Sequence, residues 1–160
     1  MCVRRYMKRL ICALPHVCSS VYEARMFSSA FGLLRVDEFT SDSKSISGTH
    51  VLCFNDISFH KINSKEELSV KVCSSKTDQR HSSTTLVICE QDDQVFCPVR
   101  FIKSYVEIRH QSLRSQLYIH LDGSNLTRYQ FGAVLQSTLS FCEVPGHFRS
   151  HSFKIGGTLG

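Results

Sequence analysis

The strongest constraint on the fold is a change in the spacing of apolar residues along the chain. Between residues 20 and 39 they recur at helical spacing, behind a capping box formed by Ser20 and Glu23. Further on, Leu68, Val70 and Val72 alternate with more polar residues, which is the period of a strand with one buried face. Beyond residue 98 the helical spacing returns. The chain therefore combines helices with extended strands, and we predict an α+β fold.

Three strand candidates separate the two helical parts of the sequence, at residues 51–59, 68–73 and 84–89. A stretch rich in Ser, Thr and Asp, 40–49, precedes the first strand and is predicted to be a solvated loop. A polar turn, 74–83, joins the second strand to the third. These features favour a small three-stranded antiparallel sheet.

Two further helices are predicted in the second half of the chain. Pro98 suits a first helical turn, where its missing N–H costs nothing. The apolar face of this helix consists of Phe101, Ile102, Tyr105 and Ile108. A short extended piece, 117–121, and the turn pair Asp122–Gly123 come next. Thr127 and Gln130 then make a second capping box. The helix behind it has the apolar stripe Phe131, Val134, Leu135, Leu139 and Cys142.

The length and composition are those of one globular domain. The chain has 160 residues, of which 42% are hydrophobic, and no apolar run approaches the length of a membrane span. A net charge of +5 permits a polyanionic partner without requiring one. Basic residues before a short apolar run at the N-terminus imitate a signal peptide, but Pro15 and His16 interrupt that run. We therefore treat residues 1–19 as an N-terminal extension.

The eight cysteines do not form a CxxC pair, and a chain of this length does not need disulfides to build a core. We expect reduced, structural thiols. Cys142, His147 and His151 have spacings like half of a zinc finger, but no upstream cysteine pair completes a four-ligand set. No metal site is predicted, and the common nucleotide-binding, zinc-protease and serine-hydrolase motifs do not occur.

Four motifs in order carry a family resemblance: LLRVDEFT at 33–40, SSKTDQ at 74–79, LTRYQF at 126–131 and HFRSHSFKIGGT at 147–158. Together they resemble the catalytic domain of tyrosine recombinases, the phage-integrase family, and most closely those of Crypton- and DIRS-type mobile elements of eukaryotes. The resemblance implies that 20–160 form a partial, mainly helical catalytic domain with a small three-stranded sheet, truncated at its C-terminal end. It also implies DNA as the partner, nuclear localisation, no cofactor and no membrane association, and it allows a homo-oligomer on DNA.

Four site residues follow from this resemblance. Arg35 matches the family's first arginine and Lys76 its hairpin lysine, while His151 matches the histidine of HxxR. The second arginine of that motif is replaced by Lys154, so the chain reads HxxK. Guanidinium groups bind the oxygens of a phosphate with two aligned N–H donors, and a lysine keeps the charge without that geometry. Lys76 would protonate the departing 5′ oxygen, and His151 would transfer a proton or bind the phosphate.

The family's nucleophile is a tyrosine beyond HxxR, and none of the tyrosines of this sequence lies there. All of them precede His151: Tyr6, Tyr22, Tyr105, Tyr118 and Tyr129. The resemblance therefore implies a DNA recombination and integration domain that is inactive as this chain. The alternatives are a non-catalytic DNA-binding module that keeps the phosphate-holding surface, and an interaction protein without DNA affinity.

The residues alone allow plainer roles for the same side chains. Arg35 would pair with Asp37 or Glu38 at a helix end, and Lys76 would be a solvated turn lysine. The apolar stripes at 101–108 and 131–142 would pack partly against helices that the family has and this sequence lacks. We therefore expect these two stripes to be exposed in part.

Overall fold

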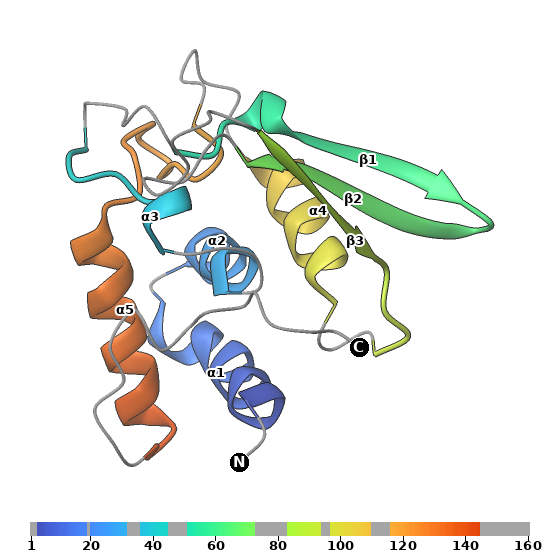
Figure 1. The fold of residues 1–160 in the computed structure, drawn as a ribbon. Helices are drawn as coiled ribbons and strands as arrows, with labels where there is room; N and C mark the ends of the chain where they lie inside the picture. Colours follow the sequence, from blue (N-terminus) through green and yellow to red (C-terminus); the bar gives the residue numbers. More distant parts are fainter. Residues whose placement is uncertain are drawn as a thin grey trace.

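The computed structural model of the chain describes residues 3–18, 20–31, 36–44, 51–72, 83–93, 97–109 and 116–144 (Figure 1). Its elements in chain order are α1 (Val3–Val17), α2 (Val21–Phe31), α3 (Val36–Phe39), the 3-10 turn η1 (Phe54–Asp56), β1 (Ile57–Ile62), β2 (Lys65–Val72), β3 (Thr84–Cys89), α4 (Pro98–Ile108) and α5 (Arg128–Phe141). The combination of helices with one small sheet confirms the α+β prediction.

The sheet has the order β1-β2-β3 and is antiparallel throughout, as predicted. Leu68 and Val70 are fully buried, and α4 packs against β2 and β3 on this face. Figure 1 shows α4 between the sheet and the group of α1, α2 and α5. A two-residue turn at Asn63 and Ser64 joins β1 to β2. Both residues have positive φ, 48° and 69°, as the tight turns that match the twist of a hairpin require.

The first strand begins at Ile57 and ends at Ile62, later at both ends than the predicted range of 51–59. The described residues just before Ile57 do not pair with β2. Instead, Cys53 forms an isolated bridge with Gln116. The Asp56 carboxylate also accepts a hydrogen bond from the Cys53 N–H at 2.8 Å, which closes η1. An apolar run that looks extended in sequence therefore leads into the sheet through a short turn.

Both predicted capping boxes lie at helix starts. The Ser20 hydroxyl accepts from the Glu23 N–H at 3.1 Å, one residue before α2 begins. The Thr127 hydroxyl accepts from the Gln130 N–H at 3.2 Å, and the Gln130 side chain accepts from the Thr127 N–H at 3.0 Å. The second pair is a complete capping box. The predicted turn before it also forms, with Gly123 in the left-handed region at φ 78°.

The first helix was not expected, because we treated residues 1–19 as an extension. In α1 the basic positions 4, 5, 8 and 9 share one side of the helix, and the apolar positions 10, 11, 13 and 14 share the other. Leu10 and Leu14 are buried in the core. The helix packs against α2 and α5. The N-terminal residues that imitate the start of a signal peptide thus belong to an amphipathic helix that packs on α2 and α5.

The two apolar stripes expected to be partly exposed are mostly buried. Ile102 and Tyr105 of α4 are fully buried, where α4 packs on α2. Phe131 and Leu135 of α5 are buried as well, and α1 packs against this helix. The expectation was wrong for most of these residues, because α2 covers the apolar side of α4 and the unexpected helix α1 covers that of α5. Phe101 is only half-buried, and Val99 occupies the core in its place.

Aromatic side chains form the centre of the core. The Phe39 ring lies 5.0 Å from that of Phe131 and 5.6 Å from that of Tyr118, edge-on in both cases. Tyr118 stacks on Tyr105 at 5.5 Å. The Phe39 ring therefore brings the short helix α3 into the centre of the core. Among the described residues, no helix has the length and apolarity needed to cross a bilayer.

Candidate functional site

All four residues of the predicted phosphate site, Arg35, Lys76, His151 and Lys154, lie outside the described residues. Their positions remain predictions. The four residues belong to three segments, and the described chain shows where each segment joins the fold. These points are the start of α3, the shared end of β2 and β3, and the end of α5.

The segment that contains Lys76 begins and ends at one end of the sheet. Val72, the last residue of β2, pairs with Thr84, the first residue of β3. Residues 73–83 therefore connect two neighbouring points of a hairpin. The two strands are adjacent and antiparallel, so Lys76 belongs to a true hairpin connection, as the sequence predicts.

Arg35 directly precedes α3, which is well anchored. Val36 is buried, and its carbonyl accepts from the Thr40 hydroxyl at 2.6 Å. The Glu38 carbonyl accepts from the Leu52 N–H at 2.7 Å, and five residues after Leu52 the chain enters β1. Ile57 pairs with Val70, close to the end of β2. The start of the Lys76 connection and α3 thus lie on the same side of the molecule (Figure 1).

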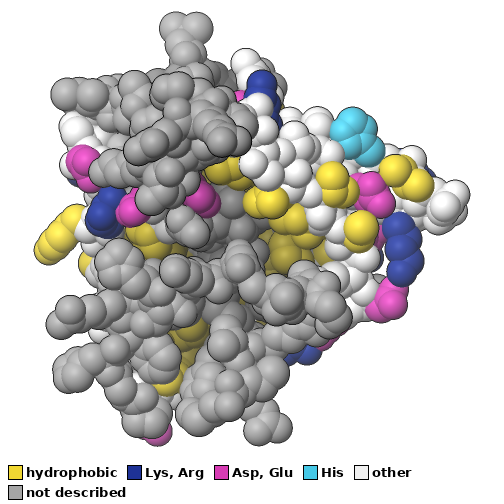
Figure 2. Space-filling view, viewed as in Figure 1, with side chains coloured by type: hydrophobic (Ala, Val, Ile, Leu, Met, Phe, Trp, Pro, Cys, Tyr) yellow, Lys and Arg dark blue, Asp and Glu magenta, His cyan; other side chains and the backbone are white. Residues whose placement is uncertain are grey.

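The described charges beside α3 are mixed. Asp37 forms an ion pair with Arg128 at 2.6 Å, and Asp42 lies 3.9 Å from the same guanidinium group. One arginine at the start of α5 thus lies beside two carboxylates, one in α3 and one just after it. Figure 2 shows the same mixture over one face, where described basic side chains lie beside acidic ones.

The segment that contains His151 and Lys154 follows the C-terminal end of α5. The last described residue, Val144, donates its N–H to the Leu139 carbonyl at 3.1 Å. Arg9 of α1 donates to the Cys142 carbonyl at 2.8 Å, so this end of α5 is docked on α1. The helix is about 21 Å long. The seven residues from Val144 to His151 can span up to about 25 Å, so the chain is long enough to return to α3.

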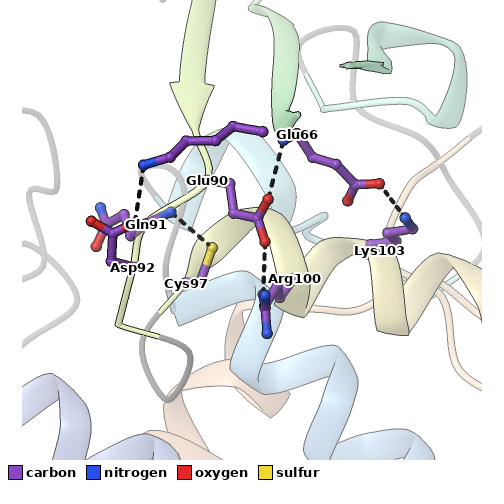
Figure 3. A network of polar contacts seen from close by, with 8 residues as sticks. Glu66, Glu90, Gln91, Asp92, Cys97, Arg100 and Lys103 are labelled. Carbon is purple, nitrogen blue, oxygen red and sulfur yellow. Dashed lines mark hydrogen bonds and ion pairs between the residues drawn. The ribbon is translucent and has the colours of Figure 1, made fainter. Parts of the chain in front are cut away.

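A polar network holds α4 against the other end of the sheet (Figure 3). The Glu66 N–H donates to the Glu90 carboxylate at 3.1 Å, and Arg100 donates to the same carboxylate at 2.9 Å. Lys103 pairs with Glu66. The Glu66 N–H and Arg100 hold the pKa of Glu90 below its usual value. No sequence motif predicts this network, because its residues come into contact only when β2, β3 and α4 pack together.

The tyrosines of the core cannot serve as nucleophiles. Tyr22, Tyr105 and Tyr118 are buried, and burial raises the pKa of each phenol. The Tyr22 hydroxyl donates to the Ile119 carbonyl at 2.7 Å. Tyr129, on the first turn of α5, is 85% exposed. A phenol must reach the phosphorus atom as a phenolate or beside a base, and the buried three do not reach solvent.

The half zinc-finger pattern has no support in the described residues. Cys142 is buried, and its thiol donates to the Arg9 carbonyl at 3.5 Å. Burial raises the pKa of this thiol, which opposes the thiolate form that zinc requires. The two histidines of the pattern lie outside the described residues. Within the described part of the chain, no group of three or more metal-ligating side chains occurs.

The predicted site therefore rests on sequence motifs and on the three points of departure described above. Comparison of the chain with protein-family models, with curated proteins and with solved structures finds no match.

Proposed function

We propose that the chain is a DNA recombination and integration domain of the tyrosine-recombinase type, nuclear, which holds DNA phosphates but does not cut DNA as these 160 residues. The observation that carries the proposal is the pairing of Val72 with Thr84. It makes the Lys76 segment a hairpin connection at the end of the sheet near α3, whose first residue follows Arg35. The segments that contain Arg35 and Lys76 thus join the described fold on the same side, which supports the proposal.

The chemistry assigned to the four residues is that of phosphate recognition. Arg35 binds two non-bridging oxygens through its forked guanidinium group. Lys76 brings a flexible ammonium group toward the 5′ oxygen, and Lys154 adds charge without a fork. His151 donates a hydrogen bond to the phosphate or transfers a proton. In phosphoryl transfer such groups act by position and charge, because little covalent chemistry falls to them.

Cleavage requires a tyrosine oxygen to attack phosphorus and displace the 5′ oxygen, and this sequence has no tyrosine beyond His151. The burial of Tyr22, Tyr105 and Tyr118 removes three substitutes. A nicked suicide substrate incubated with the chain is expected to give no covalent adduct that survives SDS. An adduct mapped to Tyr129 or to any other tyrosine would refute the inactive part of the proposal.

DNA binding is tested by the salt dependence of affinity. Removing one cationic side chain that neutralises a DNA phosphate reduces the slope of log K against log salt by about 0.9. We expect Lys76→Gln to reduce the slope by about that amount. Lys61→Gln is the matched control, because Lys61 is exposed on β1 near the far turn of the sheet. Equal slopes for the two variants, or no DNA binding by the unmodified chain, would refute the proposal.

The alternative is a non-catalytic DNA-binding module that uses charge alone. The mixed charges around Asp37, Asp42 and Arg128 favour weak binding of that kind. Arg35→Lys separates the two functions, because it keeps the charge and removes the fork. A recombinase-type phosphate clamp loses affinity in this variant, whereas a module that binds by charge alone keeps it.

A further inference from the structure

Arg9 and Cys142 make a reciprocal polar contact between α1 and the end of α5. The Arg9 guanidinium group donates to the Cys142 carbonyl at 2.8 Å, and the Cys142 thiol donates back to the Arg9 carbonyl at 3.5 Å. Cys142 directly follows α5 and is 8% exposed. Its sulfur atom therefore lies against the backbone of α1 at a known place.

Cys12 lies on α1 three residues after Arg9. In an α-helix the carbonyl of residue i points along the axis toward residues i+3 and i+4. The Arg9 carbonyl thus lies beside residues 12 and 13, and of these Ala13 is buried while Cys12 is exposed. Cys12 also adds to the rise in the pKa of the Cys142 thiol that burial causes. Cys12 is thus the exposed thiol one helical turn along α1 from the carbonyl oxygen that the Cys142 thiol contacts.

We propose that Cys12 and Cys142 form a disulfide under oxidising conditions and that this bond locks α1 onto α5. The proposal does not depend on the DNA-binding function. In a reducing compartment both residues rest as thiols, so the bond would respond to the redox state.

Oxidised glutathione is a sufficient oxidant for the reaction. The exposed Cys12 thiolate attacks one sulfur of glutathione disulfide, forms a mixed disulfide and releases one glutathione thiolate. The Cys142 thiolate then attacks the Cys12 sulfur and releases the second glutathione. Two protein thiols are oxidised, one glutathione disulfide is reduced to two thiols, and the two protons pass to the released thiolates.

The other four described cysteines are poorer candidates for this bond, among them Cys53, whose thiol donates to the Val51 carbonyl at 3.4 Å. Cys18 lies nearest in sequence to Cys12, but burial and Glu23 raise its pKa to about 11. Cys89 is on β3, where its thiol donates to the Glu67 carboxylate at 3.5 Å. Cys97 is buried at the start of α4. The last two thus belong to β3 and α4, which Figure 1 shows on the far side of the helical group from α5.

The expected consequence is a stabilised fold, because a bond between residues 12 and 142 restricts the unfolded chain over most of its length. Oxidation should raise the urea midpoint, and a reductant should return it to the starting value. Cys12→Ser removes an exposed thiol and should abolish the shift without disturbing the core. Cys89→Ser is the matched control, since Cys89 is also exposed and free, and it should keep the shift.

Peptide mapping identifies the bond directly. After treatment with oxidised glutathione, alkylation of the remaining thiols and digestion with trypsin, peptide 10–25 should be linked to peptide 129–149. Peptide 10–25 also contains Cys18, so the Cys18→Ser variant is digested in parallel and should give the same linked pair. Absence of the linked pair, or its loss in Cys18→Ser, overturns the proposal, as does an unchanged urea midpoint on oxidation.

Discussion

Removal of the Phe39 ring should destabilise the protein severely and release α3, the helix that follows Arg35. Phe39 is 2% exposed and contacts Phe131 and Tyr118 edge-on, with ring centroids at 5.0 and 5.6 Å. α3 has only four residues, so it has little stability of its own. Its single large buried anchor is this ring.

The magnitude follows from the burial and from the two ring contacts. Truncation of a buried phenylalanine to alanine costs about 3–5 kcal/mol, which includes the cavity left behind. Each aromatic pair is worth about 0.5–1.5 kcal/mol beyond its buried area, so Phe39→Ala should fall in the upper part of that range. A domain has only about 5–15 kcal/mol of stability in total.

The assay is urea unfolding followed by circular dichroism at helical wavelengths. With a slope of about 2 kcal/mol per molar urea, the midpoint should fall by about 2 M. Phe141→Ala is the control, because Phe141 is 57% exposed and stacks on His16 at the surface. Its midpoint should move by less than about 0.5 M. A destabilisation below about 1 kcal/mol in Phe39→Ala would refute the claim that this ring anchors α3.

Three further predictions follow from local contacts. Thr127→Ala removes the hydroxyl that caps α5 and should cost about 1 kcal/mol by urea unfolding, with exposed Ser137→Ala as a near-neutral control. Because the pKa of Glu90 is lowered in the folded protein, its stabilising effect is present above about pH 4.3 and is lost as the pH falls through its folded value. The difference in melting temperature between the native chain and Glu90→Gln should therefore shrink between about pH 6 and about pH 3, and a constant difference would contradict this assignment. Finally, tetranitromethane should nitrate Tyr129 well before Tyr118, as judged by peptide mass, and equal rates would show that the core opens readily.

Local signals in the sequence predicted the parts of the fold that local interactions decide. Thr127 and Gln130 bond to each other across three residues, and the alternation of Leu68 and Val70 depends only on which strand face is buried. The late start of β1 was missed because the bridge from Cys53 to Gln116 joins residues far apart in sequence. The ion pair of Glu66 and Lys103 was missed for the same reason, because its two residues are also far apart in sequence.

The first helix was missed for a different reason. Its basic positions occupy one side of the helix and Leu10 and Leu14 the other, a pattern that a signal peptide partly shares. The packing of α1 on α2 and α5 becomes visible only in the structure. For the candidate site, the motifs name Arg35, Lys76, His151 and Lys154, and the described residues fix only where their segments begin. Those assignments therefore stay predictions.

The docking of α1 on α5 also sets an order of events during synthesis. Arg9 and Cys142, which join the two helices, are 133 residues apart. At about 5–20 residues per second, a ribosome needs roughly 7–27 s to make the second after the first. Throughout that time the apolar side of α1, with Leu10 and Leu14, has no α5 to pack against. Among the described helices, α1 comes first in the chain and is thus among the last to complete its packing.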